Sequence, residues 1–519
     1  MKKLLLGNEA VARGLYEAGV TFISSYPGTP STEITECAAA YDEMYAEWAP
    51  NEKVALEAAL GASVAGARSF AAMKHVGLNV AADPLFTAAY TGVNGGLVVC
   101  VADDPAMHSS QNEQDSRHYA RAAKLPMLEP SDSGECRDFT RLAYEISEAF
   151  DTPVLLRTCT RVAHAQSLVE LKAREERPLR EYKKDPAKYV MNPGYGFRRH
   201  VVVEARLKAL AEYSESSPLN FEEMGDAAVG FVCAGSVYEY VKEAFPNASV
   251  FKVGMSFPMP IEKLRAFAAK VERLYVVEEL DGVMETELRA AGIRVDGGKD
   301  RFGCIGELSQ KKIEAAMGEK VPETETFDEP VPPRPPVMCA GCPHRGVFFT
   351  LNKLKLTVLG DIGCYTLGAS EPLSAIDTTV CMGASVSMLH GFLKTRPENA
   401  GKTVAVIGDS TFLHSGVTGL INIAYNRSVS TVLILDNSIT GMTGHQQNPA
   451  TGFTLKMEAV PPVSLEKLCE AVGIRRVRVV DPGDLKALET ALREETAADE
   501  PSVIICRKPC MLLKYVKPK

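Results

Sequence analysis

Short apolar runs alternate with helical patterns along the whole chain, and this alternation restricts the fold more than any other feature. Runs such as LVVCVADDP, TVAVIGDS and TVLILDN are rich in Val, Ile and Leu and end in turn-forming residues, as buried parallel strands do. Amphipathic stretches between them supply the crossover helices that parallel strands need. We therefore predict an α/β protein with three doubly wound domains, each a mostly parallel sheet with helices on both faces.

The 519 residues are too many for one hydrophobic core and suggest about three domains. The segment VPETETFDEPVPPRPPV is Pro-rich and acidic, as extended linkers are. Before it, AVGFVCAGSVYEYVKEAF predicts a strand, a glycine turn and an amphipathic helix, whereas ELKAREERPLREYKK suits an exposed helical connection. We expect a first domain at 1–167, a charged connection at 168–226, a middle domain at 227–319, the linker at 320–337 and a last domain at 338–519.

The N-terminal run MKKLLLG stops at Gly7, too early for a signal peptide, so we predict a strand there. EAALGASVAGARSFAAM has an alanine-rich helical pattern, and TPVLLRT, LYVVEE and PSVIICRK are further predicted strands. A net charge of −9 without clustered Lys or Arg disfavours nucleic acid and anionic membranes as partners. No apolar run is long enough for a membrane helix, and we expect a cytoplasmic protein.

Thirteen cysteines in such a chain do not indicate a disulfide framework, because cytosolic thiols stay reduced. Cys100 and Cys233 lie in strand-like runs and are expected in the core. A second group comprises a C-x-x-C pair, a cysteine in GDIGCYTLG and one in RKPCML, namely Cys339, Cys342, Cys364 and Cys510. Four converging thiolates suit either zinc or a [4Fe–4S] cluster, and their spacing does not choose between them. Cys381 and Cys506 lie nearby but are expected in or near the core.

Two polar motifs follow predicted strands in the last domain. Gly408-Asp409-Ser410 ends TVAVIGDS, and Asn437 ends TVLILDN. Carboxyl ends of parallel strands are where α/β sheets bind ligands. A carboxylate, an amide oxygen and a backbone carbonyl suit Mg²⁺, which also takes phosphate oxygens. Gly408 allows close backbone approach, and the following helix start offers amides to a phosphate. Two ordinary strand-end turns would give the same dipeptides.

These motifs resemble the GDG…NN signature of thiamine-diphosphate enzymes, here as GDS…DN. With TFLHSGVTGLINIAYNRS and NSITGMTGHQQNP, the chain resembles the 2-oxoacid:ferredoxin oxidoreductases, most closely the indolepyruvate-type α subunit. The resemblance implies that Asp409, the Asn437 side chain and the Ile439 carbonyl hold Mg²⁺, with Ser410 near the diphosphate. Further implied cofactor contacts are Pro27, Gly408, Thr440, Gly441, Met442, Cys364 and Tyr365.

The same resemblance assigns the aminopyrimidine half of a thiamine site to the first domain. Glu57 in VALEAALGASVAG is the implied glutamate for the aminopyrimidine, although an exposed helical glutamate is the alternative. Thr29 in YPGTPST is implied to contact the substrate's keto-carboxylate, and Ser31 or Thr32 there also suits a helix cap. His75 in MKHVGLNVAADP faces either the cofactor or a structural core.

In this family the four matched cysteines hold a [4Fe–4S] cluster beside thiamine. The family's usual C-terminal ferredoxin-like segment has no counterpart among the nine residues after Cys510, so the chain is either a natural short form or was cut before that segment. We expect electrons to leave through another protein or by a different route. The resemblance implies oxidative decarboxylation of an aryl 2-oxoacid such as indolepyruvate to its acyl-CoA. It also implies coenzyme A as co-substrate, a small partner subunit, ferredoxin or an equivalent acceptor, and a homodimer or heterotetramer.

Two other functions compete with this reading. A non-oxidative thiamine-dependent decarboxylase or carboligase would need no cluster. The missing ferredoxin-like segment favours it, and the four matched cysteines argue against it. A non-catalytic electron-transfer or assembly subunit would need no cofactor, and the presence of Glu57, Asp409 and Asn437 argues against it.

Overall fold

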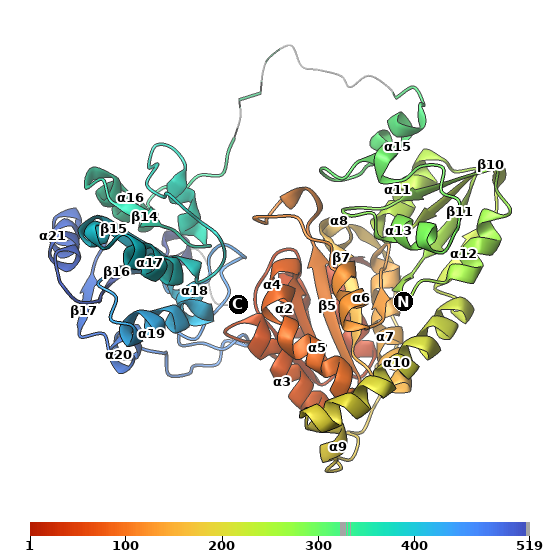
Figure 1. Ribbon diagram of the computed structural model, residues 1–519, viewed down its shortest axis with the longest axis horizontal. Helices are drawn as coiled ribbons and strands as arrows, with labels where there is room; N and C mark the ends of the chain where they lie inside the picture. The colour runs from red at the N-terminus through yellow and green to blue at the C-terminus, as the bar shows by residue number, and fades with distance from the viewer. Residues whose placement is uncertain (322–328, 330, 333, 515–519) are drawn as a thin grey trace. The chain divides into compact units, whose positions relative to one another are not determined.

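The computed structural model describes residues 1–321, 329, 331–332 and 334–514, and the predicted linker at 320–337 lies partly outside them (Figure 1). The chain divides into two compact units, residues 1–326 and residues 327–519. In the described part of the chain, no helix combines the length and apolarity needed to cross a membrane.

The first unit is built around a seven-stranded sheet with the order β12-β6-β7-β5-β4-β2-β3. All neighbours are parallel except β12, which pairs antiparallel with β6. Its strands are β2 Phe22–Ser25, β3 Tyr45–Trp48, β4 Ser69–Lys74, β5 Leu97–Asp103, β6 Met127–Leu128, β7 Val154–Cys159 and β12 Met255–Phe257. Its helices are α1 Gly7–Glu17, α2 Thr32–Ala38, α3 Glu52–Val64, α4 His75–Val80, α5 Ala82–Thr91, η1 Pro105–Met107, α6 Arg117–Ala123, α7 Ser133–Phe150 and α8 Thr160–His164.

One predicted helix was wrong in its second half. EAALGASVAGARSFAAM was expected to be helical throughout, but α3 ends at Val64 and β4 begins at Ser69. Gly66 turns the chain between them with a φ of +102°, which favours glycine. Because the first five β4 residues are buried, the strand shows no apolar–polar alternation, and a short apolar run of this kind cannot be told from a helix by periodicity.

The predicted N-terminal strand is confirmed as β1, Lys2–Leu6, which pairs antiparallel with β8, Gln166–Glu170, in a separate two-stranded sheet. The charged connection contains α9, Pro186–Tyr189, and the long helix α10, Pro193–Ser216. The helical expectation for ELKAREERPLREYKK was wrong, because Glu170 ends β8 and residues 171–185 form neither helix nor strand. Helix α10, yellow in Figure 1, contacts α5 of the first block and α12 of the middle block, so the connection braces the two blocks against each other.

The middle block has a four-stranded sheet with the order β13-β10-β11-β9, in which only β9 is antiparallel. Alternate residues of each strand face opposite ways, and two apolar clusters cover the two faces. Val232 and Val276 belong to one cluster, and Phe231 and Tyr275 belong to the other. The elements are β9 Asn220–Glu223, β10 Asp226–Cys233, α11 Ser236–Ala244, β11 Ala248–Val253, α12 Ile261–Ala268, β13 Arg273–Val277, α13 Val283–Ala290, α14 Lys299–Phe302 and α15 Gln310–Met317.

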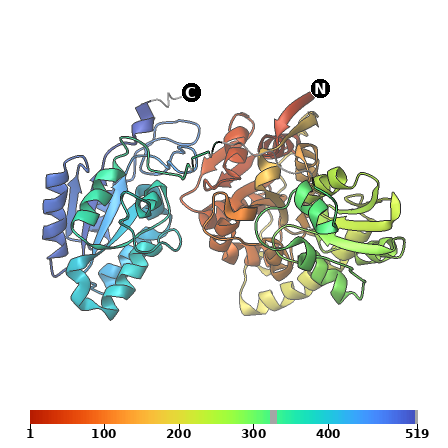
Figure 2. The same cartoon turned by 90° about the horizontal axis from the view of Figure 1, so that it is seen from above.

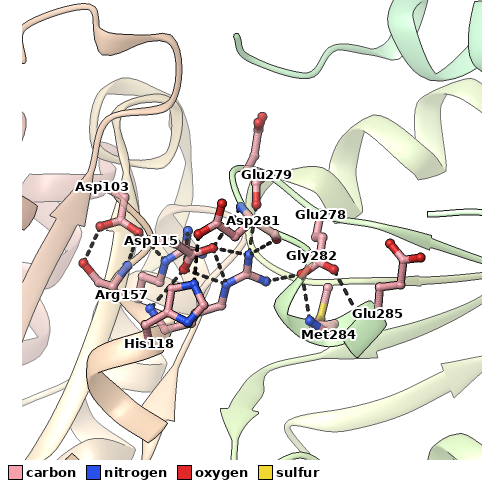
Figure 3. A network of polar contacts seen from close by, with 12 residues as sticks. Asp103, Asp115, His118, Arg157, Glu278, Glu279, Asp281, Gly282, Met284 and Glu285 are labelled. Carbon is pink, nitrogen blue, oxygen red and sulfur yellow. Dashed lines mark hydrogen bonds and ion pairs between the residues drawn. The ribbon is translucent and has the colours of Figure 1, made fainter. Parts of the chain in front are cut away.

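A buried ionic network joins the first and middle blocks within this unit (Figure 3). The Arg117 guanidinium donates to Glu278 at 2.6 Å and to the backbone oxygens of Glu279 at 2.9 Å and Asp281 at 3.0 Å. Arg157 donates to Asp103 at 2.7 Å on the first block's side. Because such groups lose hydration when buried, each must keep its partner for the junction to stay closed.

The junction has more carboxylates than guanidiniums, and burial raises the pKa of Glu279 to about 7. A carboxyl group whose pKa is higher in the folded protein than in the unfolded protein contributes stability at pH values below its unfolded pKa. This contribution is lost as the pH rises through the folded pKa of about 7. We expect the melting temperature to fall as the pH rises from about 5 to about 8. Glu279→Gln should remove up to about 3 kcal/mol of that dependence, measured by calorimetry across pH.

Exposed Glu272 offers the matched control, and Glu272→Gln should leave the pH dependence as in the wild type. A Glu279→Gln protein whose melting temperature followed the wild-type curve at every pH would contradict the assignment of that dependence to the junction.

The second unit contains a five-stranded parallel sheet with the order β14-β15-β16-β18-β17. Val404 and Val406 face the cluster that contains α16 and α21, whereas Ala405 and Ile407 face the one that contains α17 and α19. Both faces are therefore covered, as predicted, and Figure 2 shows helices flanking these strands. The elements are α16 His344–Lys353, β14 Thr357–Leu359, η2 Cys364–Ala369, α17 Ala384–Thr395, η3 Pro397–Lys402, β15 Thr403–Gly408, α18 Asp409–Thr411, η4 Phe412–Gly416, α19 Val417–Tyr425, β16 Thr431–Asp436, α20 Leu465–Ala471, β17 Arg476–Val480, α21 Leu485–Thr496, β18 Ser502–Arg507 and η5 Met511–Lys514.

Candidate functional site

The two predicted magnesium-binding side chains lie at one edge of the second unit's sheet. Strands β15 and β16 run side by side with Gly408 opposite Leu435, so Asp409 and Asn437 leave the sheet at the same carboxyl edge. Asp409 is 3% exposed and Asn437 is 7% exposed. The prediction of parallel strands is therefore confirmed, and the structure adds that the two are adjacent, whereas metal binding itself stays a prediction.

Asp409 is a buried carboxyl in a polar cluster. Burial, followed by the nearby Asp436 carboxylate, raises the pKa of Asp409 to about 7. Its Oδ2 atom accepts a hydrogen bond from Asn448 Nδ2 at 3.2 Å. A bound cation would offset the cost of the buried charge, so this donor set fits a divalent ion.

The loop after β16 folds back over Asp409. Ile439 N donates to Asn437 Oδ1 at 3.3 Å, and Thr440 Oγ1 donates to Ser410 Oγ at 3.0 Å. Thr440 exchanges backbone hydrogen bonds with Gln446 at 3.0 and 3.2 Å, which closes the loop. Met442 is 49% exposed, so of the predicted contacts on this loop it lies furthest toward the surface.

An aromatic ring requires glycine at position 408. A Cβ atom there would lie 2.6 Å from Tyr365 Cε1, so no larger residue fits without moving the ring. Tyr365 is 4% exposed and donates to the Ile362 carbonyl at 2.8 Å. His344, which the sequence analysis did not single out, lies edge-on to Tyr365 with a centroid distance of 6.0 Å. The His344 ring is buried, and burial lowers its pKa to about 4. Its Nε2 atom lies 3.4 Å from Asn437 Nδ2.

The turn that carries Cys364 is anchored by Asp361, another residue that the sequence analysis passed over. Asp361 is fully buried, and its carboxylate accepts from Gly383 N at 2.8 Å and Ser385 N at 2.9 Å. These bonds tie the turn to the start of α17. The available sequence signal was an acidic residue two positions after β14, with Gly360 between them.

The four predicted cluster cysteines lie in three parts of the second unit, and among them Cys342 N donates to the Cys339 carbonyl at 3.1 Å. Burial, followed by the thiols of Cys342, Cys510 and Cys339, raises the pKa of Cys364 to about 11. A Cβ on Gly441 would lie 3.3 Å from Cys364 Sγ, and Cys510 N donates to the Asn437 carbonyl at 3.0 Å. Cys364 and Cys510 therefore adjoin the predicted diphosphate loop. Cys100, Cys233 and Cys506 are buried, as expected, whereas Cys381 is exposed, contrary to a core position.

Metal binding by this cysteine set stays a prediction. Across residues 1–321 and 334–514 with the few described between them, no group of three or more His, Cys, Asp or Glu side chains is arranged to hold a metal ion.

In the first unit, the YPGTPST segment forms the turn between β2 and α2. Ser31 N and Oγ donate to the Gly28 carbonyl at 2.8 and 2.9 Å, and Thr32 Oγ1 accepts from Gly28 N at 2.9 Å. Pro27 is buried and Thr29 is partly exposed. Ser31 is the N-cap residue of α2 but makes no side-chain cap bond, so the hydroxyls close the turn rather than cap the helix.

Glu57 does not lie where its predicted role requires. Its side chain is 46% exposed and ion-paired with Lys53 on the outer face of α3. The buried glutamate is Glu52, 4% exposed, which opens α3 just after β3. A Cβ on Gly77 would lie 2.6 Å from Glu52 Oε1, so that carboxylate points toward the end of β4.

The correction has a simple geometric cause. Five residues rotate a helix by about 140° beyond one full turn, so Glu52 and Glu57 face nearly opposite ways. The buried stripe of α3 is Glu52, Ala55, Leu56, Ala59 and Ser63, which is the spacing of one helix face. That stripe includes Glu52 but not Glu57, and the alanine-rich sequence of α3 does not distinguish it from the other faces of the helix.

His75 is 1% exposed at the start of α4. Its Nε2 atom lies 3.1 Å from the Asn112 carbonyl, and Nδ1 is buried without a hydrogen-bond partner among the described residues. Burial lowers its pKa, so the imidazole is neutral. Thr29, Glu52 and His75 follow β2, β3 and β4, which are neighbours in one parallel sheet.

Two protein families match separate parts of the chain. Residues 13–216 match the family described as "Pyruvate flavodoxin/ferredoxin oxidoreductase, thiamine diP-bdg". Residues 361–506 match "Thiamine pyrophosphate enzyme, C-terminal TPP binding domain". With parallel sheets in both units, these matches define a thiamine-diphosphate-binding protein of the 2-oxoacid oxidoreductase class.

Full-length relatives are more specific. The chain is 41% identical to "Indolepyruvate oxidoreductase subunit IorA" of Archaeoglobus fulgidus, covering 99% of this chain and 87% of that protein. It is 41% identical to the protein of the same name from Pyrococcus abyssi, covering 98% and 86%. The chain therefore belongs to the family of the indolepyruvate oxidoreductase subunit IorA.

A solved structure supports the fold. The 2-oxoglutarate:ferredoxin oxidoreductase from Magnetococcus marinus, solved with 2-oxoglutarate, coenzyme A and succinyl-CoA bound, superimposes with a TM-score of 0.50 at 18% identity. The match covers 61% of this chain and 65% of that one.

Proposed function

We propose that this chain is the catalytic subunit of an indolepyruvate:ferredoxin oxidoreductase. It would convert an aryl 2-oxoacid and coenzyme A to the acyl-CoA and carbon dioxide, with two electrons passed to ferredoxin or an equivalent acceptor. Membership of the IorA family across 99% of the chain carries the proposal, and the buried Asp409–Asn437 edge and the adjoining cysteines support it.

The second unit's polar edge fits the magnesium diphosphate of the cofactor. Asp409, the Asn437 side chain and the Ile439 carbonyl would hold Mg²⁺, which prefers oxygen ligands. The Ser410 and Thr440 hydroxyls, 3.0 Å apart, would face the diphosphate. Thiamine diphosphate, when bound, supplies the carbon nucleophile and electron sink that decarboxylation of a 2-oxoacid needs.

In the first unit, we assign the aminopyrimidine contact to Glu52 instead of Glu57. A largely buried carboxyl at the end of a parallel strand can hold a proton at a fixed place, as a residue that tunes cofactor protons must. Thr29 is proposed to contact the substrate's keto-carboxylate. The buried, neutral His75 ring would help to orient the substrate through its Nδ1 atom, which has no hydrogen-bond partner among the described residues.

We further propose a [4Fe–4S] cluster on Cys339, Cys342, Cys364 and Cys510 as the first electron acceptor. Cys342 N donates to the Cys339 carbonyl at 3.1 Å, and Cys510 N donates to the Asn437 carbonyl at 3.0 Å. A cationic iron cluster would stabilise the thiolate forms of the four cysteines. The place of Cys364 beside Gly441 would put the cluster next to the cofactor, which suits short-range electron transfer.

Removing one of these thiols should remove the proposed cluster from the protein. We expect the anaerobically purified wild type to contain about four irons and four sulfides per chain, and Cys364→Ala to lose most of both. Cys469, a buried cysteine on α20, provides the control, and Cys469→Ala should keep its iron. Equal iron in wild type and Cys364→Ala would contradict the cluster assignment.

The domains and subunits of the proposed enzyme follow from the same family relationship. The middle block, 227–319, is proposed as a transketolase-C-terminal-like domain with a structural role, between a pyrimidine domain at 1–167 and a diphosphate domain at 338–519. A small second subunit, as the α-subunit relationship implies, and a homodimer or heterotetramer are proposed, in the cytoplasm.

The proposed function is tested by carbon dioxide release from indolepyruvate under anaerobic conditions. The chain, purified with its partner subunit, should release carbon dioxide only when thiamine diphosphate and Mg²⁺ are both present. Release that persisted after complete removal of thiamine diphosphate would overturn the proposal.

A further inference from the structure

A half-buried lysine lies at the end of a strand in the first unit's sheet. Lys74 is the last residue of β4, directly before His75. Its aliphatic chain runs along the YPGTP turn, because a Cβ on Gly28 would lie 3.3 Å from Lys74 Cγ and 3.4 Å from Cδ. The lysine therefore lies against the segment that carries Thr29.

The ammonium group of Lys74 lacks a close anion. Its Nζ atom donates to the Ser109 carbonyl at 2.6 Å, and no ion pair joins it to a carboxylate in the described part of the chain. Asp104 and Glu52 attract it from a greater distance. Both Asp104 oxygens are already engaged, by Ser109 N at 2.8 Å, Ser110 Oγ at 2.7 Å and Thr160 Oγ1 at 2.8 Å.

Such an arrangement is costly unless an anion completes it. Burial lowers the pKa of Lys74 to about 8, against the attraction of Asp104 and Glu52. The neighbouring imidazole of His75 is neutral and supplies no negative charge. A carboxylate reaching this strand end would find an ammonium group whose aliphatic chain lies against the turn that carries Thr29, and charge-assisted hydrogen bonds to such a group are the strong ones.

We propose that the Lys74 ammonium binds the carboxylate of the 2-oxoacid substrate at the carboxyl end of β4. This inference rests on the proposed function and adds a specificity-determining residue to it. Lys74 selects acids over neutral carbonyl compounds by pairing with the carboxylate before it leaves as carbon dioxide, whereas Thr29 and the turn position the keto group.

The test uses ligand binding that needs no turnover. Calorimetry on the full chain with its partner subunit, loaded with thiamine diphosphate and Mg²⁺, would compare indole-3-propionate with the neutral indole-3-propionamide. We expect the wild type to prefer the carboxylate, Lys74→Met to lose about 10- to 100-fold of that preference, and Lys74→Arg to keep most of it. Lys53→Met, a change at the exposed lysine on α3, is the matched control and should behave as wild type.

The pH dependence gives a second readout. The ammonium is present below the Lys74 pKa, so the wild-type preference for the carboxylate should fall as the pH rises above about 8, whereas Lys74→Arg should keep it. A Lys74→Met protein that weakened both ligands equally, or a wild type without a preference, would overturn the proposal. Because binding is measured without catalysis, an inactive wild type would count against the proposed function alone.

Discussion

Replacing Glu52 by Gln is expected to lower kcat for indolepyruvate decarboxylation by about 10²- to 10⁴-fold. The substitution keeps the size of a side chain that is 4% exposed at the start of α3 but removes its ability to carry a proton. Glu57→Gln should stay within about twofold of wild type, because that side chain is half exposed and paired only with Lys53 at the surface. Initial rates of anaerobic carbon dioxide release measure both variants.

The pair of substitutions separates catalysis from folding. Both lie on α3, and both exchange Glu for Gln, so they differ mainly in the face of the helix that they occupy. Thiamine diphosphate affinity and melting temperature should be retained in both. Loss of activity in Glu57→Gln with retention in Glu52→Gln would restore the assignment made from the sequence context and refute the one made from burial.

Replacing Asp409 by Asn is expected to abolish magnesium-dependent cofactor binding. A carboxylate at a divalent ion supplies most of the protein's charge there, so the apparent Kd for thiamine diphosphate should rise by at least about 100-fold. In the wild type, saturating cofactor and Mg²⁺ at about 100 times Kd should stabilise the fold by about 2.7 kcal/mol. Asp409→Asn should show no such thermal shift.

The cofactor-free variant provides an internal check. Since burial raises the pKa of Asp409 to about 7, its charged form destabilises the cofactor-free fold as the pH rises through that value. Asp409→Asn should therefore melt at or above the wild-type temperature at about pH 8 without cofactor. Asp499→Asn, at an exposed position near the end of α21, should keep the cofactor shift. A full cofactor shift in Asp409→Asn would contradict the proposed magnesium site.

The sequence was most informative where local pattern and ligand chemistry coincide. TVAVIGDS and TVLILDN have apolar runs long enough to be central strands, and their polar residues follow directly. The structure confirms them as neighbouring strands β15 and β16. Because the carboxyl ends of adjacent parallel strands lie at the same edge of a sheet, Asp409 and Asn437 also lie at one edge.

Other features depended on tertiary context. Glu57 was chosen for its neighbours in the sequence, whereas burial on α3 depends on the angle around the helix, which selects Glu52. β4 was taken for helix because its buried residues show no alternation. No local signal indicated that β12 of the middle block would join the first sheet beside β6, since strand pairing over such separations is set by packing.

The most direct test of the account is the product and electron balance of the reaction. The anaerobic chain with its partner subunit, thiamine diphosphate and Mg²⁺ would be given indolepyruvate, coenzyme A and excess ferredoxin. The account predicts indoleacetyl-CoA with about two reduced one-electron acceptors per carbon dioxide, and no product when the acceptor is omitted. Indoleacetaldehyde formed without reduction of the acceptor would contradict it and identify a non-oxidative decarboxylase.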